Sequence, residues 1–361
     1  MSVDDRPLRL LLFNLATDAD DPLLGFATVW VNRLADFCEY VDVVTMRAGR
    51  LEVADNVTVY SAGKEKGYRE SRRALEFYRI LMRLLASRRY DACFAHMMPL
   101  FAGMGAPLLK LYGVPITLWF THRQVTAKLR LALAVSSRVV TAAPSSFPIA
   151  TDKLRPLGHG IDTDFFSPEI SSPNSVIDPP AVVQVARLTP IKHQETLLRT
   201  LARGVNGQAI FVGGVPPERD AGYREKLNNL ADELGITDRV TFTGDLPARA
   251  VRDWYRLASV AVNLTPSGSF DKAALESMAC GVPTVVAHSA FDPLLGEQAD
   301  QLRIDSPEDV AGLASRLDAL LTQSLDRQKT LAAQLRARVV ETHSLDGLVK
   351  RLISVLRTGE L

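Results

Sequence analysis

Two cations follow one buried strand closely enough to bind the same anion. The apolar run VVQVA ends at Ala186, Arg187 comes next, and Lys192 lies five residues later at the predicted start of a helix. Arg offers a fork of N–H donors, Lys offers a point charge, and helix N-terminal amides add partial positive charge. The arrangement suits a diphosphate. The alternative is a pair of solvated surface cations, and spacing alone does not decide between the two.

A second polar stretch, SGSFDKAALESMACG at 267–281, places a loop before a helix that carries one carboxylate. The loop residues are Gly268, Ser269, Phe270, Asp271 and Lys272. The free N–H groups of the helix's first turn can hold hydroxyls or an anion. Glu276 follows on the next turn, where it could accept both hydrogen bonds of a ribose diol. The alternative is an exposed helical glutamate, which is the more common kind.

A third stretch, RVTFTGDLP at 239–247, reads as a strand that ends at Gly244 before a helix beginning near Pro247. Loop amides here, between Gly244 and Leu246, could recognise the edge of a nucleobase. The alternative is an ordinary turn between a strand and a helix.

These stretches belong to a pattern that alternates short apolar runs with longer amphipathic ones. The strand-like runs include LRLLLFNL, VDVVTM, DACFAH, PITLWF, QAIFVG and PTVVA. Helical stretches lie between them, for example at 70–88 and 217–234. This βαβ alternation predicts parallel sheets covered on both faces.

Two domains are expected. The Pro- and Ser-rich segment SPEISSPNSVIDPP interrupts the alternation, so residues 1–165 form the first domain, 166–180 a hinge and 181–343 the second. Residues 344–361 are expected to form a final helix that packs back toward the first domain. Ligands of parallel sheets bind beyond the carboxyl ends of strands, so the expected fold is two Rossmann-like α/β domains facing each other across a cleft.

Composition argues against a protein that binds nucleic acid through its overall charge and against one held together by disulfides. The chain has 361 residues, 47% of them apolar, and a net charge of +1, which gives no global attraction to nucleic acid. Residues 1–165 carry 21 Lys+Arg against 17 Asp+Glu, while 166–361 carry 21 against 24. The cysteines, Cys38, Cys93 and Cys280, lie in apolar contexts without a CxxC pair, which predicts buried reduced thiols.

In this order and spacing, the second-half motifs resemble retaining glycosyltransferases of family 4, which have the GT-B fold. The matching pieces are ARLTPIK, IFVGG, VTFTG and LESMACGVP, which together span most of 178–345. The resemblance is fainter in the first half. RPLGHGIDTDFFSP resembles the family's interdomain segment, TLWFTHRQ resembles a strand that delivers a histidine, and DDPLLGFATVW lies at the glycine-loop position.

The resemblance implies a role for each matching residue. Arg187 and Lys192 would hold the donor diphosphate and stabilise its charge as the glycosidic bond breaks. Glu276 would hold the ribose hydroxyls, and loop 268–272 would offer amides to the sugar. His122 would lie near the reacting centre.

Gly25 would let the first-domain loop approach the diphosphate. The family commonly has a second glutamate eight positions before the one matching Glu276, where this chain has Gly268. That departure leaves the donor sugar open. Asp271 could supply a carboxylate from a different backbone position and Lys272 could contact an acidic group, or both could be solvated loop charges.

The implied activity is retaining, metal-independent hexosyl transfer from a nucleoside-diphosphate sugar, UDP- or GDP-linked, to a hydroxyl acceptor. The pathway would be glycan, glycolipid or cell-envelope polysaccharide biosynthesis. No Asp-x-Asp follows a strand of the second domain, so neither metal nor cofactor is expected. The alternatives are a nucleotide-sugar epimerase or hydrolase of the same fold, and a catalytically weak subunit that binds a sugar nucleotide.

The segment 68–90 carries seven Arg and two Glu, and its apolar residues at helical spacing are Leu75, Tyr78, Leu81, Met82 and Leu85. Such a helix can lie on an anionic membrane, where a lipid-linked acceptor would be found. The favoured interpretation is a core-facing helix with an Arg-rich solvent face. The N-terminus is unlike a signal peptide, so the expected location is the cytoplasm, with peripheral contact at the inner membrane face as the alternative.

Overall fold

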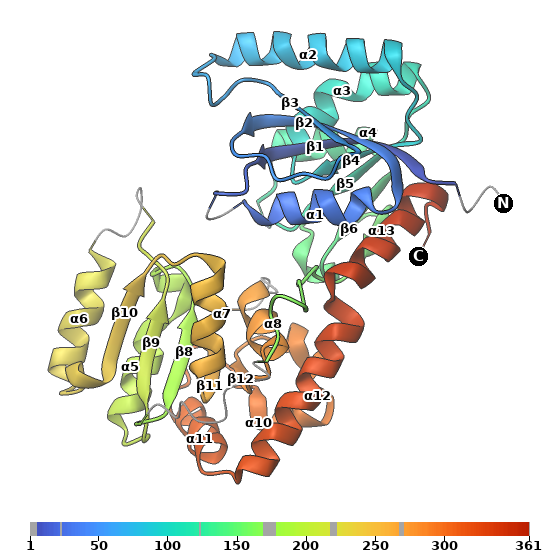
Figure 1. Cartoon of the computed structure of the whole chain (residues 1–361). Helices are drawn as coiled ribbons and strands as arrows, with labels where there is room; N and C mark the ends of the chain where they lie inside the picture. Colours follow the sequence, from blue (N-terminus) through green and yellow to red (C-terminus); the bar gives the residue numbers. More distant parts are fainter. Residues whose placement is uncertain are drawn as a thin grey trace. The chain divides into compact units, whose positions relative to one another are not determined.

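The structure is a computed structural model that describes residues 6–21, 24–122, 124–168, 178–216, 222–266 and 271–360. The chain forms two compact units. Unit 1 comprises Met1–Gly160 with Leu345–Leu361, and unit 2 comprises Ile161–Ser344 (Figure 1). Each is an α/β unit with a parallel sheet, so the expected class of two Rossmann-like domains is confirmed.

Unit 1 contains, in its described residues, a seven-stranded parallel sheet in the order β3-β2-β1-β4-β5-β6-β7. The strands are β1 Leu8–Thr17, β2 Cys38–Ala48, β3 Val57–Ser61, β4 Ala92–His96, β5 Ile116–Trp119, β6 Arg138–Thr141 and β7 Leu154–Pro156. The helices are α1 Phe26–Ala35, α2 Glu70–Ser87, α3 Pro99–Leu111, α4 Ala127–Val135 and α13 Leu345–Thr358.

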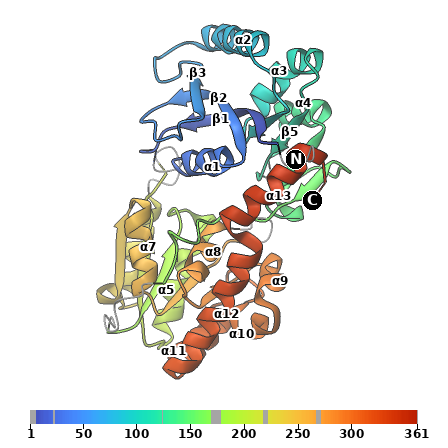
Figure 2. The ribbon, with the colours of Figure 1, turned by 45° about the vertical axis from the view of Figure 1, so that its right-hand side comes forward.

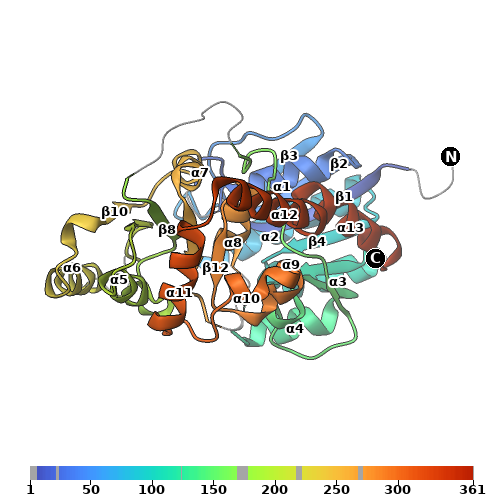
Figure 3. The ribbon, with the colours of Figure 1, turned by 90° about the horizontal axis from the view of Figure 1, so that it is seen from below.

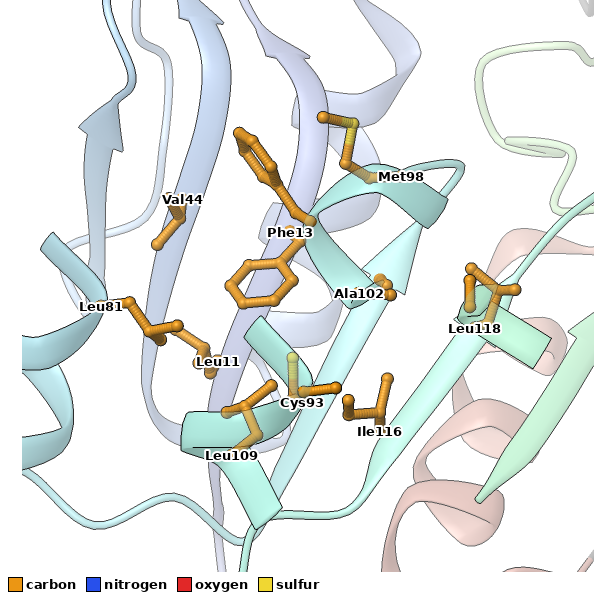
Figure 4. Packing of buried hydrophobic residues seen from close by; sticks show 14 of the residues in the cluster. Leu11, Phe13, Val44, Leu81, Cys93, Met98, Ala102, Leu109, Ile116 and Leu118 are labelled. Carbon is orange, nitrogen blue, oxygen red and sulfur yellow. The ribbon is translucent and has the colours of Figure 1, made fainter. Parts of the chain in front are cut away.

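Strand β1 contributes side chains to a core on each face of this sheet. Leu11 and Phe13 pack with residues of α2, α3 and α4, as Figure 4 shows for Leu81, Ala102 and Leu109. Leu10 and Leu12 point to the other face, where they pack with residues of α1 and α13. Burial on both faces explains why the strand is almost continuously apolar.

The last helix, α13, belongs to unit 1 although it follows the whole of unit 2. It packs against α1 and buries an apolar face on the same side of the sheet (Figure 2). The buried residues of that face are Leu345, Leu348, Val349, Leu352, Ile353, Val355 and Leu356.

Unit 2 contains, within the described ranges, a five-stranded parallel sheet in the order β10-β9-β8-β11-β12. The strands are β8 Ala181–Val185, β9 Gln208–Val212, β10 Val240–Gly244, β11 Val260–Asn263 and β12 Thr284–Val286. The helices are α5 Gln194–Ala202, α6 Tyr223–Glu233, α7 Ala248–Leu257, α8 Lys272–Ala279, α9 Asp292–Leu295, α10 Ala299–Leu302, α11 Val310–Leu321 and α12 Leu325–His343.

The direction of chain progression reverses beside β8. From β8 the chain builds β9 and β10 on one side, and then returns to place β11 and β12 on the other. Helices α5 and α11 pack on one face of the sheet, and α7 and α8 on the other (Figure 3). The loops after β8 and β11 therefore diverge, and such a switch point is where parallel sheets bind ligands.

The observed elements follow the sequence pattern with small changes in their ends. The pattern did not predict α4, α9, α10 or β7.

Cys38, Cys93 and Cys280 are free and buried, as expected. The expected hinge 166–180 falls mostly on 169–177, which lie outside the described residues.

Helix α2 combines a core-facing side with exposed apolar residues. Phe77, Ile80, Leu81, Leu84 and Leu85 are buried, so the core-facing interpretation is right for Leu81 and Leu85. Leu75 and Met82 are instead 70% and 53% exposed.

In the described parts of the chain, no helix combines the length and the apolar character needed to cross a bilayer.

Candidate functional site

The candidate site lies at the switch point of unit 2, between the loops that follow β8 and β11. Arg187 and Lys192 follow β8, whereas Thr265 and Asp271 follow β11. Lys192 and Asp271 lie 79 residues apart in the chain, yet their side chains are in contact. The structure thus brings one of the two predicted cations together with the predicted loop.

Arg187 has a fixed backbone and an exposed side chain. Its carbonyl oxygen accepts a hydrogen bond from Gln194 Nε2 at 3.0 Å. Gln194 is fully buried, and its Oε1 accepts from Tyr223 Oη at 3.2 Å. The Arg187 guanidinium forms no ion pair with any residue that the structure describes, so it is available to an anion.

Lys192 ends a 3-10 turn, Pro190–Lys192, and is held at both ends. Its carbonyl oxygen accepts from the buried Gln184 Nε2 at 2.6 Å. Its Nζ donates to Asp271 Oδ2 at 2.5 Å and to Thr265 Oγ1 at 2.9 Å. The side chain is 16% exposed, so Lys192 is not the solvated surface cation of the alternative interpretation.

His193 links this turn to α5 in an unusual conformation. Its φ of 52° and ψ of 42° lie in the left-handed region. A side chain with a Cβ is strained there, and such strain persists only where the surroundings impose it. The buried side-chain amides of Gln184 and Gln194 supply that constraint, because they hold the carbonyls of Lys192 and Arg187.

Asp271 is an anchored carboxylate and not a solvated loop charge. It caps α8 by accepting from Ala273 N at 3.3 Å, and its Oδ2 also accepts from Thr265 Oγ1 at 2.9 Å. Burial acts to raise the pKa of Asp271, but the Lys192 ammonium and the hydrogen bonds outweigh it and leave the pKa below its usual value.

Glu276 lies on α8 with its side chain only 17% exposed, so it is not an ordinary exposed helical glutamate. Burial raises its pKa, Asp271 adds to the effect, and Lys272 opposes it from 4.0 Å. A sheltered carboxylate without full compensation of its charge favours ligands that donate hydrogen bonds, such as hydroxyls.

The loops after β9 and β10 border the same edge of the sheet. Gly213 has φ 136°, and a Cβ there would lie 2.2 Å from Ala186 O, so only glycine allows this approach to the backbone before Arg187. Gly213 N donates to Gly244 O at 3.0 Å, and Gly244 itself has φ 73°. The side chain of Leu246 is partly buried against the core of unit 2.

The first-domain candidates lie in unit 1. Gly25 precedes α1, and its N–H donates to Asp21 O at 2.9 Å. A Cβ at Gly25 would lie 2.8 Å from Asp21 O, so the loop requires glycine. His122 follows β5 and is exposed, and its Nδ1 accepts from Gln124 N at 3.1 Å. Gly268, Ser269 and Phe270 lie outside the described residues.

Sequence reasoning missed Gln184, Gln194 and Thr265. Gln184 carries a signal that could have revealed it, because it is an amide within the otherwise apolar strand run AVVQV. Gln194 and Thr265 carry no comparable signal, since a single polar residue beside a loop is common.

A separate hollow of about 870 Å³ lies between α5 and α6. It shares His193 with the Lys192 turn, but Lys192, Asp271 and Glu276 do not line it. Its charged lining consists of Glu195, Glu225, Glu233, Glu308, Arg199 and Lys226. The acidic excess makes this hollow unsuited to a diphosphate.

Comparison with known proteins points to the same half of the chain. Residues 179–323 match the family described as glycosyl transferases group 1. D-inositol 3-phosphate glycosyltransferases are similar, that of Mycolicibacterium smegmatis with 28% identity over 53% of this chain and 45% of its own length. That of Mycobacterium marinum has 32% identity over 49% of this chain and 38% of its own. The chain thus spans less than half the length of these curated relatives.

Solved structures resemble both units together. Anabaena HepE in complex with UDP has a TM-score of 0.75 at 17% identity, with 97% of this chain and 99% of that chain covered. Sucrose-phosphate synthase from Thermosynechococcus elongatus has a TM-score of 0.74 at 19% identity, with 97% and 98% covered. The chain therefore has the two-domain fold of GT-B glycosyltransferases, and residues 179–323 match the glycosyl transferases group 1 family.

Proposed function

We propose that this chain is a retaining glycosyltransferase that moves a sugar from a nucleoside-diphosphate donor to a hydroxyl acceptor without a metal ion. The observation that carries the proposal is the contact between Lys192 and Asp271 at the switch point, with Arg187 on the same loop as Lys192, inside the region that matches glycosyl transferases group 1. Departure of a nucleoside diphosphate develops negative charge, and fixed cations at that position lower the barrier.

The described residues support distinct roles at the donor. The exposed Arg187 guanidinium reaches the diphosphate as a fork, while the Lys192 ammonium supplies a second charge. Glu276 takes the ribose hydroxyls because its sheltered carboxylate favours hydroxyl donors. Backbone groups near Gly244 and Leu246 recognise the base.

The remaining roles rest on the sequence resemblance. Gly268, Ser269, Phe270 and Lys272 contact the sugar in this proposal. His122 and Gly25 act from unit 1, at the reacting centre and at the diphosphate.

UDP is the first donor nucleotide to test, because the similar HepE structures contain UDP or UDP-glucose. GDP is the next. An inositol phosphate is the first acceptor to test, because the similar curated proteins are named D-inositol 3-phosphate glycosyltransferases. A place in glycolipid or cell-envelope polysaccharide biosynthesis follows if the natural acceptor is lipid-linked.

The test is incubation of the full chain with UDP-, GDP-, ADP- and TDP-sugars and a set of acceptors. We expect transfer from one donor class, an anomeric signal in the product that matches the donor, and unchanged rates in EDTA. Arg187→Ala should abolish transfer. A product that forms without any acceptor would indicate an epimerase or hydrolase, and binding without turnover would indicate a binding subunit.

We also propose that the protein acts in the cytoplasm and contacts the inner face of an anionic membrane through α2. Leu75 and Met82 are exposed on the same helix as Arg72, Arg79 and Arg83, a combination suited to the interface of anionic lipid. Vesicles that contain phosphatidylglycerol should sediment the protein, and Leu75→Ser with Met82→Ser should reduce this binding. Equal sedimentation with neutral vesicles would contradict the proposal.

A further inference from the structure

The ion pair between Lys192 and Asp271 joins the two loops that diverge at the switch point of unit 2. Lys192 Nζ lies 2.5 Å from Asp271 Oδ2, and Thr265 Oγ1 hydrogen-bonds to both partners at 2.9 Å. Both side chains are largely buried, with 16% and 18% of their surfaces exposed. A cation proposed to receive phosphate is therefore already in contact with an anion of the chain.

The position of this anion is fixed by two hydrogen bonds. Asp271 caps α8 by accepting from Ala273 N, and it also accepts from Thr265 Oγ1. The carboxylate cannot move away without losing the cap of α8, while the buried Gln184 holds the backbone of Lys192 through its carbonyl. A diphosphate that approaches Lys192 must share the ammonium with the carboxylate or displace it.

Capping does not require a charge at position 271. Asn and Ser cap helices about as well as Asp, and the NH2 of Asn could donate to Thr265 Oγ1 in place of the hydrogen bond that Asp271 accepts. What the carboxylate alone adds is a negative charge beside Lys192, and at such short range this charge strongly opposes a second anion.

On these grounds we propose that Asp271 is the internal counter-ion of Lys192 and limits how tightly the site holds a phosphate-bearing ligand. This inference rests on the proposed function, because it gives Asp271 a role at the same donor site. A site that holds the donor diphosphate less tightly also releases the nucleoside diphosphate product more readily.

A double-mutant cycle on the full chain tests the inference, with UDP, GDP, ADP and TDP as probes in calorimetric titrations. Asp271→Asn should tighten binding of the preferred diphosphate on the order of tenfold, the effect of one unit charge at hydrogen-bond distance in a partly buried site. Asp271→Ser is the second variant, since Ser also caps the helix. The gain should be clearly smaller in the Lys192→Gln background, where only the direct repulsion between Asp271 and the ligand is relieved.

A second measurement needs no ligand. Lys192 should be acetylated by acetic anhydride severalfold faster in Asp271→Asn than in the wild type, with the exposed Lys226 as the internal reference. Unchanged or weaker diphosphate binding in Asp271→Asn, or a gain of the same size without Lys192, would overturn the inference. If the wild type binds none of the four diphosphates, the proposed function fails, and the labelling result alone decides the role of Asp271.

Discussion

Gln194 Nε2 donates a 3.0 Å hydrogen bond to the carbonyl oxygen of Arg187, and through this contact the first turn of α5 holds the loop that follows β8. Gln184 makes the equivalent bond to the Lys192 carbonyl. The two cations proposed for the donor site thus lie on a loop whose backbone is held by buried amides. We therefore expect Gln194 and Gln184 to act as positioning residues.

Replacing Gln194 with Leu should weaken donor nucleotide binding about tenfold. A loss of this size is expected when a residue that orients a ligand-binding group is removed. It should also lower the free energy of unfolding by about 1–3 kcal/mol, because the Arg187 carbonyl loses its partner. Gln208→Leu is the matched control, since Gln208 Nε2 donates to Pro179 O away from the site. That control should lower stability without a change in nucleotide affinity, and equal affinity losses would contradict the assignment.

His193→Gly should stabilise the protein. The left-handed conformation costs a residue with a Cβ about 1–2 kcal/mol, whereas glycine costs up to about 1 kcal/mol in backbone entropy. The net gain should be about 0.5–1 kcal/mol in urea unfolding of the full chain. His193→Ala keeps the Cβ and should give no gain, so stabilisation by alanine as well would point to the imidazole as the source of strain.

Gly213→Ala should be far more damaging than Gly204→Ala. Both glycines have positive φ, but a Cβ at Gly204 meets nothing within 4 Å, whereas one at Gly213 would overlap Ala186 O. The extra loss for Gly213→Ala should be about 2 kcal/mol or more, because backbone must move to relieve the overlap. Thermal unfolding compares the two variants, and equal losses would show that the loop beside Arg187 can relax.

The two carboxylates of the site should affect stability with opposite signs. The pKa of Asp271 is lowered by folding, so its ionised form stabilises the protein above the unfolded-state pKa and this contribution is lost as pH falls. The pKa of Glu276 is raised, so its ionised form destabilises the fold as pH rises through the folded-state pKa.

At neutral pH, Glu276→Gln should therefore raise the free energy of unfolding and Asp271→Asn should lower it. Both effects should shrink toward pH 3, where the carboxyls become protonated. Urea unfolding from pH 3 to pH 8 measures the two profiles. A Glu276→Gln variant that is less stable at neutral pH would contradict the burial effect, and we expect the same variant to bind nucleotide more weakly.

Most strands were predictable because each is a short apolar run closed by Gly, Pro or a polar residue. Helix α4, with the sequence AKLRLALAV, lacks a clear polar face. The strand-like runs on both sides of it make this helix hard to recognise from the sequence. LRP, which forms β7, is too short, and its proline is unfavourable in a strand, so it can be recognised only from its pairing with β6.

The site was predictable as a set of residue types but not as a set of contacts. Arg187, Lys192 and Glu276 stand out by their positions next to strands and helices. The pairing of Lys192 with Asp271 depends on β8 lying beside β11, whereas the sequence order makes β9 the expected neighbour. Tertiary topology, which local pattern does not encode, therefore decides what neutralises Lys192.

Because α13 is made last, the two units cannot complete their folding at the same stage of synthesis. Unit 2 is one continuous segment, so all its residues are synthesised before those of α13. Unit 1 must wait, because the apolar surface that α13 covers beside α1 stays open until residues 345–356 have emerged. The part of the chain made first is thus the last to be completed, and its apolar surface beside α1 stays uncovered until α13 packs on it.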